Sequence, residues 1–293
     1  MKSLLTLKQK IGLCLAGLLL LLNVFTWQEV FALNGPHYLK VDVLDIGQGD
    51  SIFIETPDMR HILIDGGPDS AVLGKLAERL PFFKKSLDVV ILTHPDQDHL
   101  MGLLYVLQKY KVDYIIWTGM VRDGANYSKW VALLEQKQQQ GSKIIITKLG
   151  DKIKNGNVVI ETLNPSENLE GTFFKEANDT GVVERLTYGK NSFLFTADIP
   201  SEIEQAMIDA NINLASDVLK VGHHGSKYSS SETFLQEVNP NIAAISAGAH
   251  NTYGHPTQEV LQRLENSGIT TLRTDQSGDV QMVSDGENIK INK

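Results

Sequence analysis

Four apolar, β-rich runs of this sequence each end in residues that bind metals or exchange protons. Asp65 follows "HILI", the loop "HPDQDH" follows "DVVILT", Asp198 follows "NSFLFTA", and His223-His224 follows "DVLKVG". In layered α/β folds the ends of strands meet at one edge, where binding sites are commonly built. The pattern therefore predicts strands and helices in layers, with one polar site at a sheet edge.

Strand-like and helix-like segments alternate from about residue 38 to the end of the chain. Two successive halves, each with apolar strands followed by helices, predict two sheets packed together with helices outside, in an α/β (α+β) layered sandwich. We interpret "YGKN" (188–191) as a hairpin turn. We interpret "TLRTD" (271–275) and "DVQMVSDG" (279–286) as edge strands, and 127–140 as a helix.

Composition restricts the class of protein. The chain has 293 residues and a formal net charge of -8, which argues against a protein that wraps nucleic acid non-specifically. Nucleic acid stays possible as a substrate, because bound metal ions supply local positive charge. The only cysteine is Cys14, so neither a disulfide framework nor a thiolate metal site is expected.

The N-terminal run is typical of a membrane segment. Lys2, Lys8 and Lys10 precede an uncharged stretch that ends near Trp27. Its length is near the lower limit of about 17–25 residues for a spanning helix. The positive-inside rule places the rest of the chain outside the cytoplasm. Residues 1–35 are therefore predicted to be a membrane anchor or a signal segment with a cleavage site near residues 30–32, and residues 36–293 a separate domain. We favour the uncleaved anchor.

The loop "HPDQDH" contains His94, Asp96, Asp98 and His99 within six positions. A solvated loop with a helix cap explains one aspartate, but it leaves both histidines and the second aspartate without a role. Alternate residues of an extended loop point the same way, so His94 and Asp96 can share one ion while Asp98 and His99 bind a second. We therefore prefer a metal site.

Two further segments supply candidate ligands. Alone, Asp198 would be read as a turn residue, but beside the loop "HPDQDH" a carboxylate that bridges two ions about 3.5–4 Å apart is the better interpretation. At most one of His223 and His224 coordinates a given metal, because adjacent side chains diverge. We interpret Asp65 as a residue that supports the site structurally. We interpret "GQGDS" (47–51) as a tight turn. The segment "NTYGHP" (251–256) fits a turn and a substrate-contacting loop equally well.

These motifs together resemble a known family. "HPDQDH" resembles the HxHxDH metal motif of the metallo-β-lactamase superfamily, with aspartate at its second histidine. "LDIGQGDSI", "ILIDGG", "LKVGHHGSKYSS" and "NTYGHPTQEVLQRL" resemble the extracytoplasmic metallo-hydrolase domain of ComEC-type competence proteins. The resemblance implies a four-layer αββα sandwich, here preceded by one N-terminal apolar helix. It also implies a two-metal site that hydrolyses phosphodiesters.

The resemblance assigns roles by position. It implies that the metal ligands are His94, Asp96, Asp98, His99, Asp198 and His224, and that Asp98, His223 and Lys227 are candidate catalytic residues. Three departures from the family pattern are Ala197, where glycine is usual, Leu103, where a second glycine is usual, and Gly181, where serine is frequent.

The expected cofactors are two divalent metal ions, Zn²⁺ or Mn²⁺, because histidines are mixed with several carboxylates. The expected partners are DNA or another phosphodiester substrate, the membrane through the N-terminal segment, and a DNA-uptake machinery. The channel-forming membrane region of those proteins is not found here, so we do not expect this chain to transport DNA alone. Two other interpretations stay open: a phosphodiesterase for small or cell-surface molecules, and a non-catalytic membrane-tethered scaffold.

Overall fold

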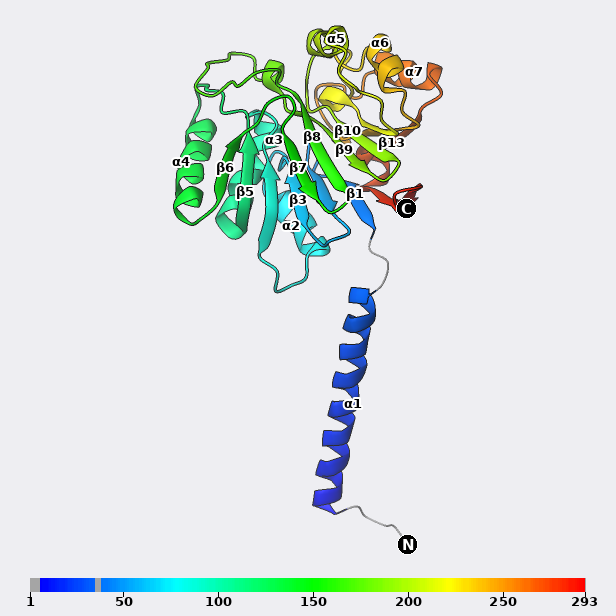
Figure 1. Cartoon of the computed structure of the whole chain (residues 1–293). Helices are drawn as coiled ribbons and strands as arrows, with labels where there is room; N and C mark the ends of the chain where they lie inside the picture. The colour runs from blue at the N-terminus through cyan, green and yellow to red at the C-terminus, as the bar shows by residue number, and fades with distance from the viewer. Residues whose placement is uncertain (1–5, 35–37, 293) are drawn as a thin grey trace. The chain divides into compact units, whose positions relative to one another are not determined.

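The structure is a computed structural model that describes residues 6–34 and 38–292. The chain divides into two compact units, Met1–His37 and Tyr38–Lys293. The first unit contains one described helix, α1 (Leu7–Asn34) (Figure 1). Its residues 7–27 are exposed. Its segment Leu7–Trp27 is long and apolar enough to cross a membrane, but a signal sequence has the same properties. The predicted boundary at residues 35 and 36 lies outside the described residues.

Two β-sheets form the centre of the second unit. The strand order of the eight-stranded sheet is β15-β14-β1-β2-β3-β4-β5-β6, and that of the seven-stranded sheet is β13-β12-β11-β10-β9-β8-β7. The strands of the first sheet are β1 (Leu39–Val43), β2 (Ile52–Glu55), β3 (His61–Ile64), β4 (Ser86–Ile91), β5 (Lys111–Trp117), β6 (Lys143–Ile146), β14 (Val280–Ser284) and β15 (Ile289–Asn292). Those of the second are β7 (Lys152–Asn155), β8 (Val158–Asn164), β9 (Val183–Tyr188), β10 (Asn191–Phe195), β11 (Val218–Lys220), β12 (Ile242–Ile245) and β13 (Thr270–Arg273).

Helices cover the outer face of each sheet. The larger helices are α2 (Ala71–Arg79), α3 (Gln97–Lys109), α4 (Ala125–Gln139), α5 (Ser201–Asp209), α6 (Glu232–Val238) and α7 (Gln258–Asn266), and short turns are η1 (Asn178–Thr180), η2 (Gly222–Gly225) and α8 (Thr274–Ser277). Leu76, Leu107 and Trp130 bring α2, α3 and α4 into one apolar cluster with the first sheet. Met207, Phe234 and Leu264 do the same for α5, α6 and α7 on the second. The predicted four-layer αββα sandwich is confirmed.

A third apolar cluster fills the space between the two sheets. It contains Ile54 and Ile91 from the first sheet and Phe193 and Val218 from the second, all buried. The described core residues of this unit lie between Leu39 and Ile289, and none belongs to α1. The unit therefore holds its own hydrophobic core without the N-terminal helix.

Parallel pairing brings the polar strand ends together. Strands β3, β4 and β5 are parallel, as are β10, β11 and β12. Asp65 follows β3, the loop "HPDQDH" follows β4, Asp198 follows β10, and His223-His224 follows β11. Because these ends lie at the same edge of the packed sheets, four segments far apart in sequence converge on one site.

The local elements agree with the sequence-based predictions in part. The hairpin at "YGKN" is confirmed, since Tyr188 pairs with Asn191 between antiparallel β9 and β10. Strand β13 is an edge strand, as predicted. The interpretation of 279–286 as an edge strand was wrong, because β15 pairs with the outer side of β14. Strand β15 has only four residues and is mostly exposed, so its sequence predicts a strand only weakly. Helices α2 and α6 were not predicted from the sequence.

Candidate metal centre

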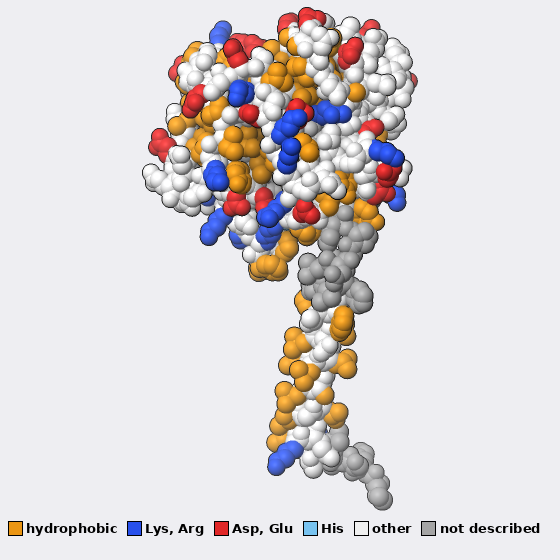
Figure 2. All heavy atoms as spheres, in the orientation of Figure 1, with side chains coloured by type: hydrophobic (Ala, Val, Ile, Leu, Met, Phe, Trp, Pro, Cys, Tyr) orange, Lys and Arg blue, Asp and Glu red, His pale blue; other side chains and the backbone are white. Residues whose placement is uncertain are grey.

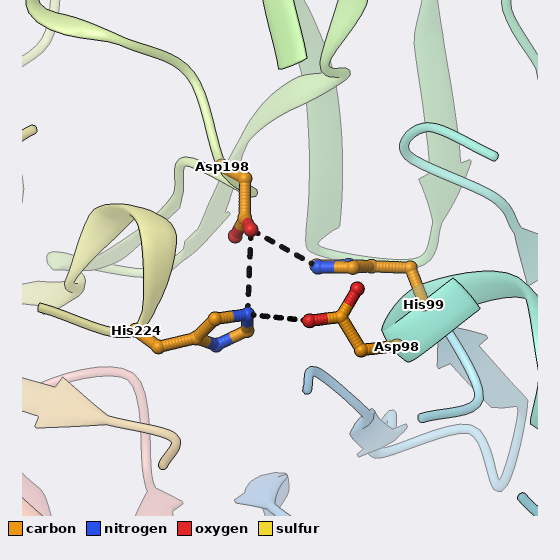
Figure 3. Close-up of side chains that lie close together, drawn as sticks. All are labelled: Asp98, His99, Asp198 and His224. Carbon is orange, nitrogen blue, oxygen red and sulfur yellow. Dashed lines mark ion pairs between the residues drawn. The ribbon is translucent and has the colours of Figure 1, made fainter. Parts of the chain in front are cut away.

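Four side chains meet where the two sheets share an edge. Asp98 and His99 come from the first turn of α3, Asp198 from the segment after β10, and His224 from η2. One ligand atom from each lies within 4.8 Å of the others, which makes them a group that could hold a metal ion (Figure 3). This four-residue set is called the metal cluster below.

Asp198 lies at the centre of the metal cluster. Its Oδ2 lies 3.3 Å from Nε2 of His99 and 3.3 Å from Nε2 of His224. The same Nε2 of His224 lies 3.3 Å from Oδ2 of Asp98 (Figure 3). Both histidines and Asp198 are buried, while Asp98 is partly exposed. The oxygen and nitrogen atoms therefore converge on one point that is open on the Asp98 side.

Hydrogen bonds fix the imidazole rings of His94 and His99, which follow β4 of the first sheet. Asp65 accepts hydrogen bonds from the backbone N–H and the hydroxyl of Thr93, at 2.9 and 2.7 Å. Its Oδ2 also lies 2.8 Å from Nδ1 of His99. Since the Thr93 hydroxyl proton points to Asp65, its oxygen accepts from Nδ1 of His94 at 3.0 Å. Asp65 thus orients His99 directly and His94 through Thr93, and both Nε2 atoms are left facing the site.

His224 is oriented in the same way from the second sheet. Its Nδ1 lies 3.1 Å from the carbonyl oxygen of Ser246 and 3.2 Å from Oδ1 of Asp50. The Nε2 atoms of His94, His99 and His224 are buried and have no hydrogen-bond partner among the described residues. Three aimed imidazole nitrogens and a buried carboxylate form a donor set that suits a divalent transition metal, so the residues fit the ion that this kind of site requires.

The charges of the cluster shift its pKa values in opposite directions. Burial opposes ionisation of Asp198, yet the neighbouring His224 and His99 hold its pKa well below the usual value. Burial also opposes a charge on His99, but Asp198 and Asp65 raise the pKa of His99 well above its usual value. For His94, burial together with the charge of His99 lowers the pKa. A bound metal cation would supply, beside Asp198 and Asp65, the positive charge that protonated His99 otherwise carries.

His94 and Asp96 lie beside the metal cluster but outside the group of four. The rings of His94 and His99 are 4.1 Å apart between centroids. Oδ2 of Asp96 lies 3.7 Å from Nε2 of His94, while its Oδ1 accepts a hydrogen bond from Arg122. Asp96 is the N-cap residue of α3, but its side chain does not cap the helix. One carboxylate oxygen is therefore held by Arg122 and the other faces His94.

The two remaining candidates differ in position. His223 faces a hollow of about 150 Å³ above the cluster, with its Nε2 3.8 Å from Oδ2 of Asp198. Gln48, Asn178 and His255 also line this hollow. Lys227 does not line it; its side chain is exposed and its Nζ lies 5.1 Å from the ring centre of Tyr228. The structure brings His223 to the site and leaves Lys227 aside.

The two adjacent histidines have a strained backbone conformation. His223 and His224 both adopt left-handed conformations, with φ of 48° and 54°. Ala197, just before Asp198, has φ of 46°. Non-glycine residues rarely adopt such angles, and they are found where the surrounding structure enforces them, often at functional sites. The left-handed angle at residue 197 also gives a physical reason for the glycine that the family usually has there.

Two residues at the site were missed by sequence reasoning. Lys220 and Asp50 are both buried and form an ion pair of 2.7 Å behind His224. Gly49 allows the approach of this segment, because a Cβ on Gly49 would lie 2.2 Å from the carbonyl oxygen of Asp98. The lysine within the apolar run "DVLKV" was the available signal. "GQGDS" is a tight turn, as predicted, and also carries a supporting carboxylate.

An αββα sandwich with histidines and aspartates at the shared edge of its sheets is the architecture of a metal-dependent hydrolase. The family model of the metallo-beta-lactamase superfamily matches residues 44–250. The chain belongs to this superfamily and is related to competence proteins.

Curated relatives cover most of this chain. ComE operon protein 3 of Bacillus subtilis is 36% identical over 260 residues, which is 83% of this chain and 32% of that protein. Competence protein ComA of Neisseria gonorrhoeae is 33% identical over 245 residues, 82% of this chain and 32% of that protein. This chain therefore spans about a third of the length of these relatives.

Solved structures share the fold. The metallo-beta-lactamase fold protein YhfI from Bacillus subtilis matches with a TM-score of 0.54 and 16% identity, over 85% of this chain and 100% of that chain. CmlA from Streptomyces venezuelae, a diiron beta-hydroxylase, matches with a TM-score of 0.53 and 14% identity, over 82% and 53%. At these identities the likeness concerns the fold and not the reaction.

Proposed function

We propose that this chain is a metal-dependent phosphodiesterase that acts on DNA outside the cytoplasm, attached to the membrane by α1. The observation that carries the proposal is the metal cluster at the base of a small polar hollow, together with the buried Nε2 atoms of His94, His99 and His224, which form no hydrogen bond. The named relatives are competence proteins, which supports a nucleic-acid substrate.

The hollow above the cluster suits a phosphate group. Its volume of about 150 Å³ is small, and carboxylate, amide and imidazole groups line it. A wider hollow of about 590 Å³ adjoins it and shares Gln48, Asp96, Asp98 and Tyr253. Arg122 lines this wider hollow. The proposed arrangement places the scissile phosphate over the cluster and the rest of the substrate in the wider hollow.

Two divalent ions, Zn²⁺ or Mn²⁺, would supply an activated water and would neutralise charge on the phosphate oxygens. His99, His224, Asp98 and Asp198 would hold one ion, and His94 and Asp96 would hold the other with Asp198 between them. His223 lines the hollow and is positioned to donate a proton or a hydrogen bond to the phosphate. Asp65 and Asp50 would keep the ring nitrogens of His99 and His224 aimed at the ions.

The test uses residues 38–293, which hold their own core, with Mn²⁺ or Zn²⁺ supplied. Single-stranded DNA and bis(p-nitrophenyl) phosphate should both be hydrolysed, and Asp198→Asn should remove both activities. Metal analysis after dialysis should approach two ions per chain. Failure to hydrolyse either substrate, with full metal content, would favour the non-catalytic scaffold.

A small-molecule phosphodiesterase is the second candidate. The net charge of -8 and the small volume of the hollow above the cluster favour it. Hydrolysis of bis(p-nitrophenyl) phosphate without any cleavage of DNA would support this candidate against the first.

Location is tested separately. Protease added to intact cells should remove the folded domain if α1 anchors it outside the cytoplasm. Protection of the domain, under conditions where a surface protein is cut, would contradict the proposed topology.

A further inference from the structure

Two phenylalanine side chains project into solvent at the end of the domain opposite the metal cluster. Phe82 and Phe83 lie in the loop between α2 and β4, and they are 93% and 85% exposed. Figure 2 shows hydrophobic side chains at the tip of the folded domain, where Figure 1 has the loop that follows α2. Adjacent aromatic rings with this exposure mark a contact surface, since ordinary surfaces leave large apolar groups scattered. We call these two residues the aromatic tip.

A cleft lined by lysines lies beside the aromatic tip. Lys85, Lys109, Lys111 and Lys137 line a space of about 450 Å³, and no carboxylate lines it. Nζ of Lys85 lies 6.0 Å from the ring centre of Phe82, which connects the cleft with the tip. The backbone N–H of Lys111 donates to the carbonyl oxygen of Lys85 at 2.9 Å. In a chain of net charge -8, this lysine cleft is a local concentration of positive charge.

Lys137 differs from the other three lysines of the cleft because it is buried. Its side chain is only 7% exposed, and its Nζ donates to the carbonyl oxygen of Tyr110 at 2.9 Å. Among the described residues no carboxylate forms an ion pair with it, and burial lowers its pKa. A buried ammonium group without a counter-charge is costly. An anion that entered the cleft would neutralise it.

The chain enters the domain at this same end. Lys40 of β1 pairs with Glu55, Glu55 pairs with His61, and Ile62 pairs with Val89. The beginning of β1 is therefore level with the first half of β4, the strand that follows the aromatic tip. The start of β1 thus lies at the end of the domain that carries the aromatic tip, whereas the metal cluster lies beyond the other end of β4.

We propose that the aromatic tip and the lysine cleft together form a docking surface for an anionic lipid bilayer. The two rings enter the interfacial region, and the lysines face the phosphates of the headgroups. A bilayer fits better than a soluble anion or a nucleic acid, because the two rings lie at the end of the domain where β1 begins, and β1 is the first strand after a helix that is apolar enough to cross a membrane. Docked in this way, the domain would hold its metal cluster away from the bilayer and open to solvent.

The experiment measures binding of residues 38–293 to vesicles by flotation, with chelator present so that metal chemistry plays no part. Vesicles of phosphatidylcholine mixed with phosphatidylglycerol should bind the domain, and pure phosphatidylcholine should bind it much less. The double variant Phe82→Ser/Phe83→Ser should weaken binding at least about tenfold. Lys109→Ala/Lys111→Ala should weaken it about fivefold for each lysine, and less at high salt.

Matched controls use exposed residues elsewhere on the domain. Phe173→Ser removes another exposed ring, and Lys175→Ala/Lys190→Ala removes two exposed lysines. These controls should bind vesicles like the parent, and all variants should keep the parent's melting temperature.

Three outcomes would overturn the proposal. The first is binding by the Phe82→Ser/Phe83→Ser variant that equals the parent's. The second is complete inhibition of vesicle binding by soluble glycerol phosphate, which would show a soluble-anion site. The third is a change in oligomeric state caused by the same variants without lipid, which would show a contact between copies of the chain. Loss of DNA hydrolysis in parallel experiments would bear on the proposed function and not on this surface.

Discussion

Lys220 donates a hydrogen bond from Nζ to Oδ2 of Asp50 over 2.7 Å, and both side chains are buried. The other oxygen of Asp50 lies 3.2 Å from Nδ1 of His224. One residue from a central strand of the second sheet thus reaches a loop of the first sheet and fixes the orientation of a proposed metal ligand. The two sheets are connected at the site by charge as well as by apolar packing.

Lys220→Met should lower the free energy of unfolding by about 3–5 kcal/mol, because it removes the ammonium partner of the buried Asp50 carboxylate. Lys220→Met/Asp50→Asn should recover much of this loss. The control is Lys40→Met, which removes a pair of the same 2.7 Å length that is half-exposed and should cost at most about 1 kcal/mol. Urea unfolding in chelator measures all three. Equal losses for Lys220→Met and Lys40→Met would contradict the role given to the buried pair.

Asp96→Ala should keep the fold and reduce phosphodiester hydrolysis to background, because the proposed second ion loses a ligand. Asp96→His restores the commoner family motif and should shift the metal preference from Mn²⁺ toward Zn²⁺, since imidazole is the softer ligand. The control Asp209→Ala removes an exposed carboxylate at the end of α5. Circular dichroism, metal titration and hydrolysis of bis(p-nitrophenyl) phosphate provide the readouts. Parental turnover by Asp96→Ala with full metal content would rule out its role as a ligand.

Glu184 should make stability depend on pH. Burial, together with the charge of Asp65, raises the pKa of Glu184 to about 8 from a usual value of 4.5. Folded Glu184 therefore keeps a proton that the unfolded chain releases between these pH values. This contribution to stability is fully present below about pH 4.5 and is lost as pH rises toward about 8, by at most about 1.4 kcal/mol per pH unit.

Glu184→Gln keeps the shape of the side chain and cannot ionise, so it should lose less stability than the parent as pH rises from about 5 to about 8. Urea unfolding at both pH values, with chelator present, measures the difference between parent and variant. Parallel pH profiles would mean that Glu184 titrates alike in the folded and unfolded states.

Two helical glycines should respond oppositely to alanine. A Cβ on Gly102 of α3 would lie 1.8 Å from the carbonyl oxygen of Gly66, so Gly102→Ala forces α3 away from the segment after β3. We expect a loss of more than about 2 kcal/mol and weaker metal binding, since α3 carries Asp98 and His99. Gly74 of α2 has open space around it, so Gly74→Ala should stabilise the fold by about 0.5–1 kcal/mol. Thermal unfolding of both variants tests the pair, and a neutral Gly102→Ala would show that the two segments separate easily.

The sequence alone determined the features that depend on short chain separations. The spacing of "HPDQDH" places four ligand-type side chains in one loop because residues this close cannot move far apart. The turn at "YGKN" joins adjacent strands for the same reason. Apolar runs with polar ends predicted both the layered fold and the edge at which the site lies, because parallel strands share one direction.

Only the tertiary structure decided which distant residues meet. Asp50 and Lys220 are 170 positions apart, and no local pattern relates them. Left-handed backbone angles at His223 and His224 place the second ring in the metal cluster and the first at the hollow, which neighbouring sequence letters cannot distinguish. The pairing of Arg122 with Asp96 arises in the same way. The pairing of Asp50 with Lys220 follows from the packing of one sheet against the other, and that of Arg122 with Asp96 follows from the parallel pairing of β4 with β5. Both depend on how the whole domain packs and not on neighbouring sequence.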